Sequence, residues 1–129
     1  MKYFKTDGIR GEAYTYVTLD LAYKIGLFFS NSDKEIVIGI DPRESSPHLA
    51  HALIKGLKNH KNVSYAGVIP TPGLMYYSLV NSTIGIMITA SHNEYKDNGI
   101  KIFLDGIKIN KEYIKLKENE EFNIYYTSN

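Results

Sequence analysis

A short polar segment carries the residues of this chain that are best suited to chemistry. Ser91, His92 and Asn93 directly follow an apolar segment of strand character that ends at Ala90. In an α/β sheet, ligands bind just beyond the carboxyl ends of the strands. A serine hydroxyl in that place, with cations near it, predicts a carrier of a phosphoryl group.

A phosphoserine makes demands on its neighbours that other residues of the chain could meet. Cations must neutralise a phosphate with close to two negative charges, and a positioned group must move a proton. His92 and Lys101 are candidates for both tasks, and the Arg10 guanidinium could bind phosphate through two hydrogen bonds. Gly8 and Gly11, which flank Arg10, would let the backbone approach a ligand closely.

The sequence is less informative about a metal. A divalent ion usually bridges phosphate oxygens in phosphoryl transfer, but no Asp-x-Asp-x-Asp cluster occurs in the chain. An oxygen of phosphorylated Ser91 could ligate Mg²⁺, and carboxylate ligands must then come from elsewhere. His48 and His51 are three residues apart on a predicted helix and could chelate a metal. No third ligand accompanies them, so we interpret them as part of a solvated face.

Length and composition set the outer bounds. A chain of 129 residues is one ordinary domain, and its 43% of hydrophobic residues suffice for a core. The net charge of +1 provides no general attraction to nucleic acid or to a membrane. Cysteine is absent, which excludes disulfides and thiolate metal sites. With no signal-like or membrane-spanning apolar run visible, we expect a cytoplasmic protein.

The hydrophobic pattern predicts strands that alternate with helices. Strands are expected over 3–6, 35–40, 63–68 and 83–88, and helices over 19–29, 47–58, 71–80 and 110–116. Thr18 or Asp20 would cap the first helix, and Thr71 would cap the third with Pro72 at its first position. A hairpin is expected from 100–103 and 107–109 around Leu104-Asp105-Gly106. This order predicts a layered α/β domain with a largely parallel sheet.

Four separated stretches together resemble the N-terminal domain of the α-D-phosphohexomutases, and in particular the branch that acts on glucosamine phosphate. The order and spacing of the stretches match through about residue 115. The stretches are Met1 to Gly11 with Thr6-Asp7-Gly8-Ile9-Arg10-Gly11, Gly39-Ile40-Asp41-Pro42-Arg43, Gly67-Val68-Ile69-Pro70-Thr71-Pro72, and Thr89-Ala90-Ser91-His92-Asn93 with Asp97-Asn98-Gly99-Ile100-Lys101.

The resemblance implies both a fold and a function. It implies a three-layer α/β/α domain with a mixed, mostly parallel sheet over residues 1–117, a tail over 118–129, and the absence of the family's domains II to IV. The serine matching Ser91 gives its phosphate to a hexose 1- or 6-phosphate and takes back the other phosphate of the bisphosphate formed. Matching also implies catalytic roles for Ser91, Arg10, His92 and Lys101, and phosphate or substrate contacts for Thr6, Gly8, Asn93 and Asn98.

The same resemblance implies cofactors and partners. Mg²⁺ would bind through the Ser91 phosphate and ligands of a missing domain, and a hexose bisphosphate would act as intermediate or activator. The partners would be a phosphosugar substrate, expected to be a hexosamine phosphate, and the missing domains II to IV. The surface facing those domains would favour self-association. The isolated fragment would be inactive. Glucose or mannose phosphates are an alternative substrate, and a stand-alone, non-catalytic binding remnant is an alternative function.

Three residues depart from the family pattern, and one arginine has two interpretations. Lys5 and Ser46 stand where glycine is usual, and Glu94 stands where proline is usual. None of them removes a chemical group that the mechanism needs. Arg43 could serve function, but we favour a structural role in which it ties its own loop to Asp41 or Glu44.

Overall fold

The computed structural model describes residues 9–15, 17–90 and 93–109. Ser91, His92, Thr6 and Gly8, and the expected strand 3–6 and helix 110–116, lie outside the described residues, as does the expected boundary at residue 117. The elements in chain order are β1 (Ile9–Glu12), α1 (Leu19–Phe29), β2 (Ile36–Ile40), α2 (Ser46–Gly56), β3 (Val63–Val68), α3 (Thr71–Asn81), β4 (Ile84–Ile88), β5 (Asp97–Leu104) and β6 (Ile107–Lys108).

One mixed sheet organises these elements. Its strand order is β1-β5-β4-β2-β3, with β6 also paired to β5. Strand β2 is parallel to β3 and β4, whereas β5 is antiparallel to β4, β1 and β6. Strand β5 alone therefore runs against the other described strands, which confirms the expected mixed and mostly parallel sheet.

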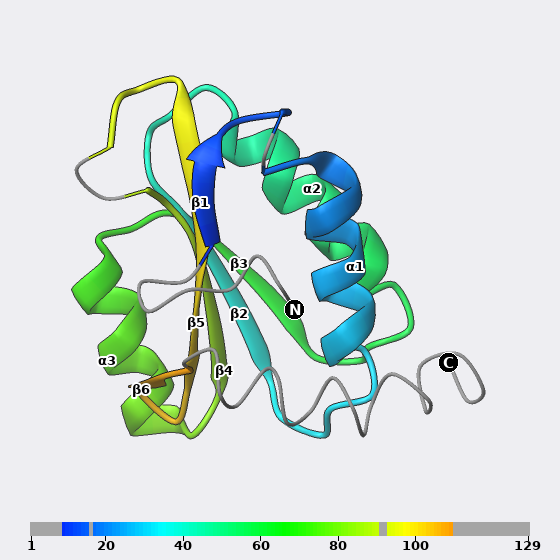
Figure 1. The fold of residues 1–129 in the computed structure, drawn as a ribbon. Coiled ribbons are helices and arrows are strands. Elements are labelled where there is room, and N and C mark those ends of the chain that lie inside the picture. The colour runs from blue at the N-terminus through cyan, green and yellow to red at the C-terminus, as the bar shows by residue number, and fades with distance from the viewer. Residues whose placement is uncertain (1–8, 16, 91–92, 110–129) are drawn as a thin grey trace.

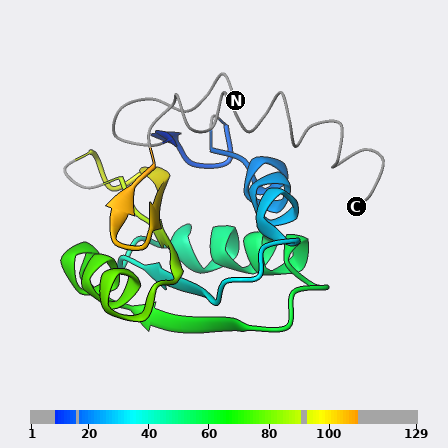
Figure 2. The same cartoon turned by 90° about the horizontal axis from the view of Figure 1, so that it is seen from below.

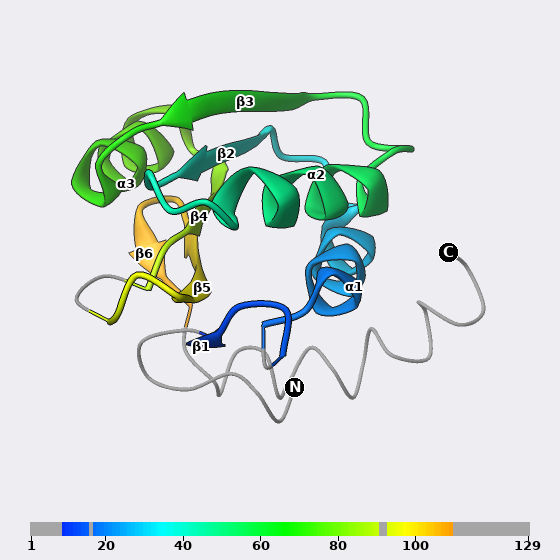
Figure 3. The ribbon, with the colours of Figure 1, turned by 90° about the horizontal axis from the view of Figure 1, so that it is seen from above.

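Helices cover both faces of the sheet and form the three expected layers. Helices α1 and α2 lie together on one face, and α3 lies by itself on the other (Figure 1). The views from below and above show the same division (Figures 2 and 3). None of the helices in the described part of the chain is long and apolar enough to cross a membrane.

The central strands are buried on both faces, as their nearly continuous apolar sequences predict. Every residue of β2 and β4 is buried. Because successive side chains alternate between faces, Ile38 and Ile86 join the cluster beneath α1 and α2, whereas Val37 and Met87 join the cluster beneath α3. The two strands that precede the site segments are therefore the most firmly packed part of the sheet.

A local signal accounts for the start of α1, whereas two other helix predictions need correction. Helix α2 runs over Ser46–Gly56 and not over 47–58, and the cap of α3 is not the expected residue. The Thr18 hydroxyl accepts a hydrogen bond from the Leu21 amide at 3.0 Å, so Thr18 is the N-cap of α1. The N-cap of α3 is Pro70, and Thr71 is already helical, so the prediction of Thr71 as cap was wrong by one residue.

Asp105 and Gly106 both have positive φ angles, 53° and 84°, as a two-residue turn between β5 and β6 requires.

Candidate functional site

The described residues on either side of Ser91 and His92 lie at the carboxyl end of β4. Strand β4 ends at Ile88 in the middle of the sheet, and the Thr89 amide donates to the Gly99 carbonyl at 2.9 Å. The Asn93 amide donates to the Ala90 carbonyl at 3.0 Å. The two flanking residues are thus bonded to each other at the carboxyl end of a central strand, the expected place for a ligand site.

Arg10 and Lys101 lie on neighbouring strands beside this end of β4. Arg10 on β1 pairs with Gly99 of β5, and Lys101 pairs with Met87 of β4. Paired residues point to the same face of a sheet, and Met87 belongs to the cluster beneath α3. The register therefore places both cations on the α3 face, Arg10 exposed and Lys101 half-buried. Their predicted roles toward phosphate stay predictions, but the fold brings them to one edge of the sheet.

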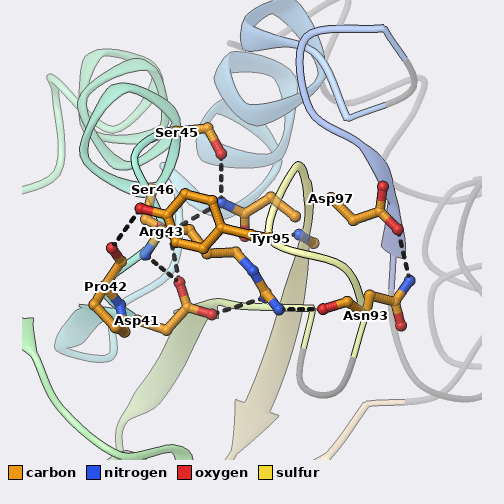
Figure 4. Close-up of polar contacts among 10 residues, drawn as sticks. Asp41, Pro42, Arg43, Ser45, Ser46, Asn93, Tyr95 and Asp97 are labelled. Carbon is orange, nitrogen blue, oxygen red and sulfur yellow. Dashed lines mark hydrogen bonds and ion pairs between the residues drawn. The ribbon is translucent and has the colours of Figure 1, made fainter.

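The buried Arg43 side chain pairs with the half-buried Asp41 and connects the loop after β2 to the segment after β4 (Figure 4). The Arg43 side chain is only 8% exposed, and its Nη1 lies 2.9 Å from Asp41 Oδ2. Its Nη2 donates to the Asn93 carbonyl at 2.8 Å. The expected tie between Arg43 and Asp41 is confirmed, and the contact with Asn93 extends it across the site.

A second set of hydrogen bonds lies next to this ion pair. Asn98 is fully buried, and its Nδ2 donates to the hydroxyls of Ser45 and Ser46 at 2.8 and 2.9 Å. The Ser46 hydroxyl in turn donates to Asp41 Oδ1 at 2.8 Å. Ser46, one of the departures from the family pattern, thereby joins Asn98 to Asp41. The phosphate contact expected of Asn98 stays a prediction, since the amide is engaged here with α2.

Asn93 and Tyr95 hold the outer part of the same segment. Asn93 Nδ2 donates to Asp97 Oδ2 at 3.2 Å, and the Tyr95 hydroxyl donates to the Pro42 carbonyl at 3.3 Å (Figure 4). The predicted substrate contact of Asn93 is not tested by these bonds. Together with the bonds of Arg43 and Asn98, the Tyr95 bond attaches residues 93–98 to the β2–α2 loop at several points.

An open pocket of about 320 Å³ lies beside this network, between β1, the start of α2 and residues 95–96. Its walls include the carboxylates of Glu12 and Glu44, with Lys96 as a cation. Carboxylates disfavour a phosphate by like-charge repulsion. The pocket by itself is therefore poorly suited to hold a phosphate.

The described residues also do not form a metal cage. Among residues 9–15, 17–90 and 93–109, no group of three or more His, Cys, Asp or Glu side chains is placed to hold a metal ion. His48 and His51 are both exposed on α2. This part of the chain does not fit a complete magnesium site.

Sequence reasoning missed part of this site for an identifiable reason. Ser45, Ser46 and the Asn93 carbonyl were not expected to bond to Asn98 and Arg43. The available signal was that two polar segments, 41–46 and 89–98, each follow a buried strand. Strands β2 and β4 are adjacent and parallel, and the Asp41 amide donates to the Ile88 carbonyl at 3.1 Å. The two segments therefore meet at one edge of the sheet.

These features define a three-layer α/β/α domain with a cluster of polar loops at the carboxyl ends of its central strands. The family model described as phosphoglucomutase/phosphomannomutase, alpha/beta/alpha domain I, matches residues 1–124. The chain belongs to this family, and the matched part is its domain I.

Individual relatives agree with the family match. The chain is 43% identical over 123 residues to a phosphoglucosamine mutase of Fusobacterium nucleatum, covering 86% of this chain and 27% of the relative. It is 44% identical over 128 residues to a phosphoglucosamine mutase of Bacillus pumilus, covering 92% and 28%. A solved phosphoglucomutase/phosphomannomutase family protein from Burkholderia thailandensis superposes with a TM-score of 0.77 at 28% identity, covering 94% of this chain and 30% of that one. The chain spans less than a third of the length of these relatives.

Proposed function

We propose that this chain is the phosphoserine-bearing domain of a phosphohexomutase that interconverts hexosamine 6-phosphate and hexosamine 1-phosphate, with glucosamine phosphate as the substrate. The observation that carries the proposal is the family match over residues 1–124, with relatives that are phosphoglucosamine mutases. The fold supports it, because β4 leads into the segment of Ser91 at the edge of the sheet where Arg10 and Lys101 also lie.

The proposed reaction has two balanced transfers. In the first, the bond between phosphorus and Ser91 Oγ breaks, and a bond forms from phosphorus to the free O1 hydroxyl of the hexosamine 6-phosphate. The proton of that hydroxyl passes through a base, for which His92 and Lys101 are the candidates, to Ser91 Oγ. The bisphosphate then reorients. In the second transfer, the bond between phosphorus and O6 breaks, a bond forms from phosphorus to Ser91 Oγ, and the proton of the Ser91 hydroxyl passes through the same base to O6, which releases the hexosamine 1-phosphate. Arg10 neutralises the charge of the transferred group, and Lys101 does so where His92 is the base.

Several parts of the proposed enzyme must come from outside this chain. A magnesium ion, which would stabilise charge on the phosphoryl oxygens, needs carboxylates beyond those described here. The relatives are more than three times as long, so we propose that their additional domains supply these ligands and the contacts to the sugar. The 129 residues alone are proposed to be inactive, and the working enzyme to be cytoplasmic.

A glucose or mannose phosphate is the second candidate substrate. The family description and the solved neighbour both name phosphoglucomutase/phosphomannomutase. Comparing kcat/KM for the 1-phosphates of glucosamine, glucose and mannose on the complete native polypeptide separates the two. A preference for glucosamine 1-phosphate supports our choice, and a preference for either other sugar overturns it.

The first experiment is an intact mass of the native polypeptide from its source cells, with fragmentation across Ser91. We expect one phosphoryl group, located on Ser91. In the same polypeptide, Ser91→Ala should abolish turnover, because no other group of the site replaces the phosphoryl carrier. Ser64→Ala removes an exposed hydroxyl on the edge strand β3 and should leave turnover unchanged. Unmodified Ser91, or turnover retained by Ser91→Ala, would refute the proposal and favour a non-catalytic binding module.

A further inference from the structure

Arg43 joins two segments that are fifty residues apart in the chain. Its guanidinium is buried and forks between the Asp41 carboxylate and the backbone carbonyl of Asn93. A guanidinium is suited to this task because it is planar, always charged and offers several donors in fixed directions. The contact reaches the backbone of Asn93, so it acts on the path of the main chain after Ser91 and His92.

Three hydrogen bonds hold Asp41 and thereby orient Arg43. The Asp41 carboxylate accepts from the Arg43 amide at 3.2 Å, from Arg43 Nη1 at 2.9 Å and from the Ser46 hydroxyl at 2.8 Å. Ser46 is the first residue of α2 and is fully buried. The carboxylate is therefore fixed from both its own loop and the adjoining helix, and the guanidinium has little freedom to turn.

We propose that Arg43 is a positioning residue for Ser91. It holds the chain at Asn93, while Asn93 itself is bonded to Ala90 on the other side of the serine. The Asp41–Arg43 pair thus anchors the serine segment to β2 and α2, two of the firmly packed elements of the domain. The consequence for catalysis rests on the proposed function, in which Ser91 Oγ attacks and releases phosphorus.

The proposed role affects the rate of transfer more than the binding of substrate. Misplacing a reacting group by about 1 Å can lower a rate roughly 10²-fold. Arg43 is buried, and its contacts with Asp41 and Asn93 lie within the domain. Weakening its hold should therefore lower kcat while KM changes little.

The test variant is Arg43→Lys, which keeps the charge near Asp41 but loses the fork that reaches two partners. Lys34→Met is the matched control. Lys34 Nζ also contacts a carboxylate, Asp105 Oδ1 at 2.8 Å, and a backbone carbonyl, that of Ser82 at 3.2 Å, but at the opposite end of the strands. Asp41→Asn is a second variant that keeps the guanidinium and loses the charge that orients it.

Hydrogen–deuterium exchange followed by mass spectrometry is the first readout, because it needs no activity. In Arg43→Lys we expect exchange in peptides covering 89–99 to rise about tenfold, with peptides from α1 unchanged, and a smaller rise in the same place for Asp41→Asn. Lys34→Met should leave 89–99 as in the unaltered protein. Unchanged exchange over 89–99 in both variants, or an equal rise across the whole chain, would overturn the proposal.

Turnover in the complete native polypeptide is the second readout. For Arg43→Lys we expect kcat to fall about 10- to 100-fold while KM stays within about threefold. A local rise in exchange with unchanged kcat would overturn the positioning role. Absence of phosphate and turnover in the unaltered polypeptide would instead overturn the proposed function, and the exchange result would still decide whether Arg43 holds the segment.

Discussion

The two faces of the sheet are covered to different depths. Beneath α1 and α2, nineteen buried hydrophobic residues of the described chain form one cluster, whereas the cluster beneath α3 has four. Helices α1 and α2 also pack closely on each other, and α3 has no such partner among the described elements. We infer that the face under α1 and α2 provides most of the stability of the domain, whereas α3 leaves apolar surface exposed for contact.

The sequence of α3 explains its shallow attachment. The helix carries no charged residue and has apolar residues around most of its circumference, which is typical of a helix that is covered on several sides. It buries only Leu74 and Ser78. The large apolar side chains that stay exposed on α3 are Met75, Tyr76, Tyr77, Leu79 and Val80. A contiguous apolar surface of this kind marks a contact site more often than a solvent face.

Matched leucine truncations should show the difference most strongly. Leu53 on α2 and Leu74 on α3 are both fully buried. We expect Leu53→Ala to lower the free energy of unfolding by about 4 kcal/mol, because its surroundings are closed and leave a cavity. Leu74→Ala should cost about 2 kcal/mol, since the thin layer around it can relax. Urea denaturation measures both values, and equal losses would contradict the comparison.

Glycine-to-alanine substitutions should differ in sign between the faces. A Cβ on Gly26 of α1 would lie 2.2 Å from the Leu53 carbonyl oxygen of α2, so the two helix backbones would have to separate. We expect Gly26→Ala to cost about 3 kcal/mol.

The control for this substitution is Gly73→Ala on α3. A Cβ there would meet only the side chain of Ile69, at 3.4 Å and beyond. The better helix propensity of alanine should then stabilise the protein by up to about 1 kcal/mol. Thermal unfolding of both variants measures the pair, and a loss for Gly73→Ala as large as that for Gly26→Ala would show that α3 is packed as tightly as α1.

Sequence reasoning succeeded where one local signal dominated. The helix over 19–29 and the strand over 63–68 have the predicted bounds, because helical periodicity with a Thr18 cap marks the first and a short run that begins and ends with valine marks the second. It missed β1. Its sequence Ile-Arg-Gly-Glu is a poor strand former, and the strand exists because it pairs with residues 97–100 of β5.

In the candidate site, too, sequence reasoning predicted a local contact and missed a contact between distant segments. A pairing of Arg43 with Asp41 or Glu44 was predicted because both carboxylates are within two positions of it in the chain, and the structure shows the pair with Asp41. The contact between Arg43 and the Asn93 carbonyl could not be, because it depends on β2 and β4 lying side by side. Which strands lie side by side depends on the topology of the sheet, and the spacing of residues in the sequence does not predict it.

Polar substitutions on the outer surface of α3 should change association and leave stability nearly constant. Tyr76 and Val80 are 67% and 59% exposed and lie one turn apart. We expect the 129-residue chain to self-associate through this surface and Tyr76→Gln with Val80→Gln to weaken that association. The free energy of unfolding should change by no more than about 0.5 kcal/mol, as is usual for exposed positions.

Sedimentation velocity over a wide concentration range measures this association. The matched control carries His51→Gln and Lys55→Gln, two exposed residues one turn apart on α2. It should sediment like the unaltered chain. A strictly monomeric unaltered chain would contradict the expected self-association, and an equal effect of the α2 control would move the contact away from α3.

The smallest expected effect concerns the polar edge of the α3 face. The Tyr77 hydroxyl of α3 donates to Glu35, and this hydrogen bond, with minor contributions from desolvation and the Glu35 charge, raises the pKa of Tyr77 above 10.0. A raised pKa means that the fold favours the neutral phenol, so the contact contributes stability below about pH 10 and loses it as pH rises through the folded pKa. Glu35→Gln should lower the pKa of Tyr77 in an NMR titration of the tyrosine rings, whereas Glu44→Gln, at the other end of the strands, should not. An unchanged Tyr77 titration in Glu35→Gln would mean that α3 is not attached to β2 through this contact.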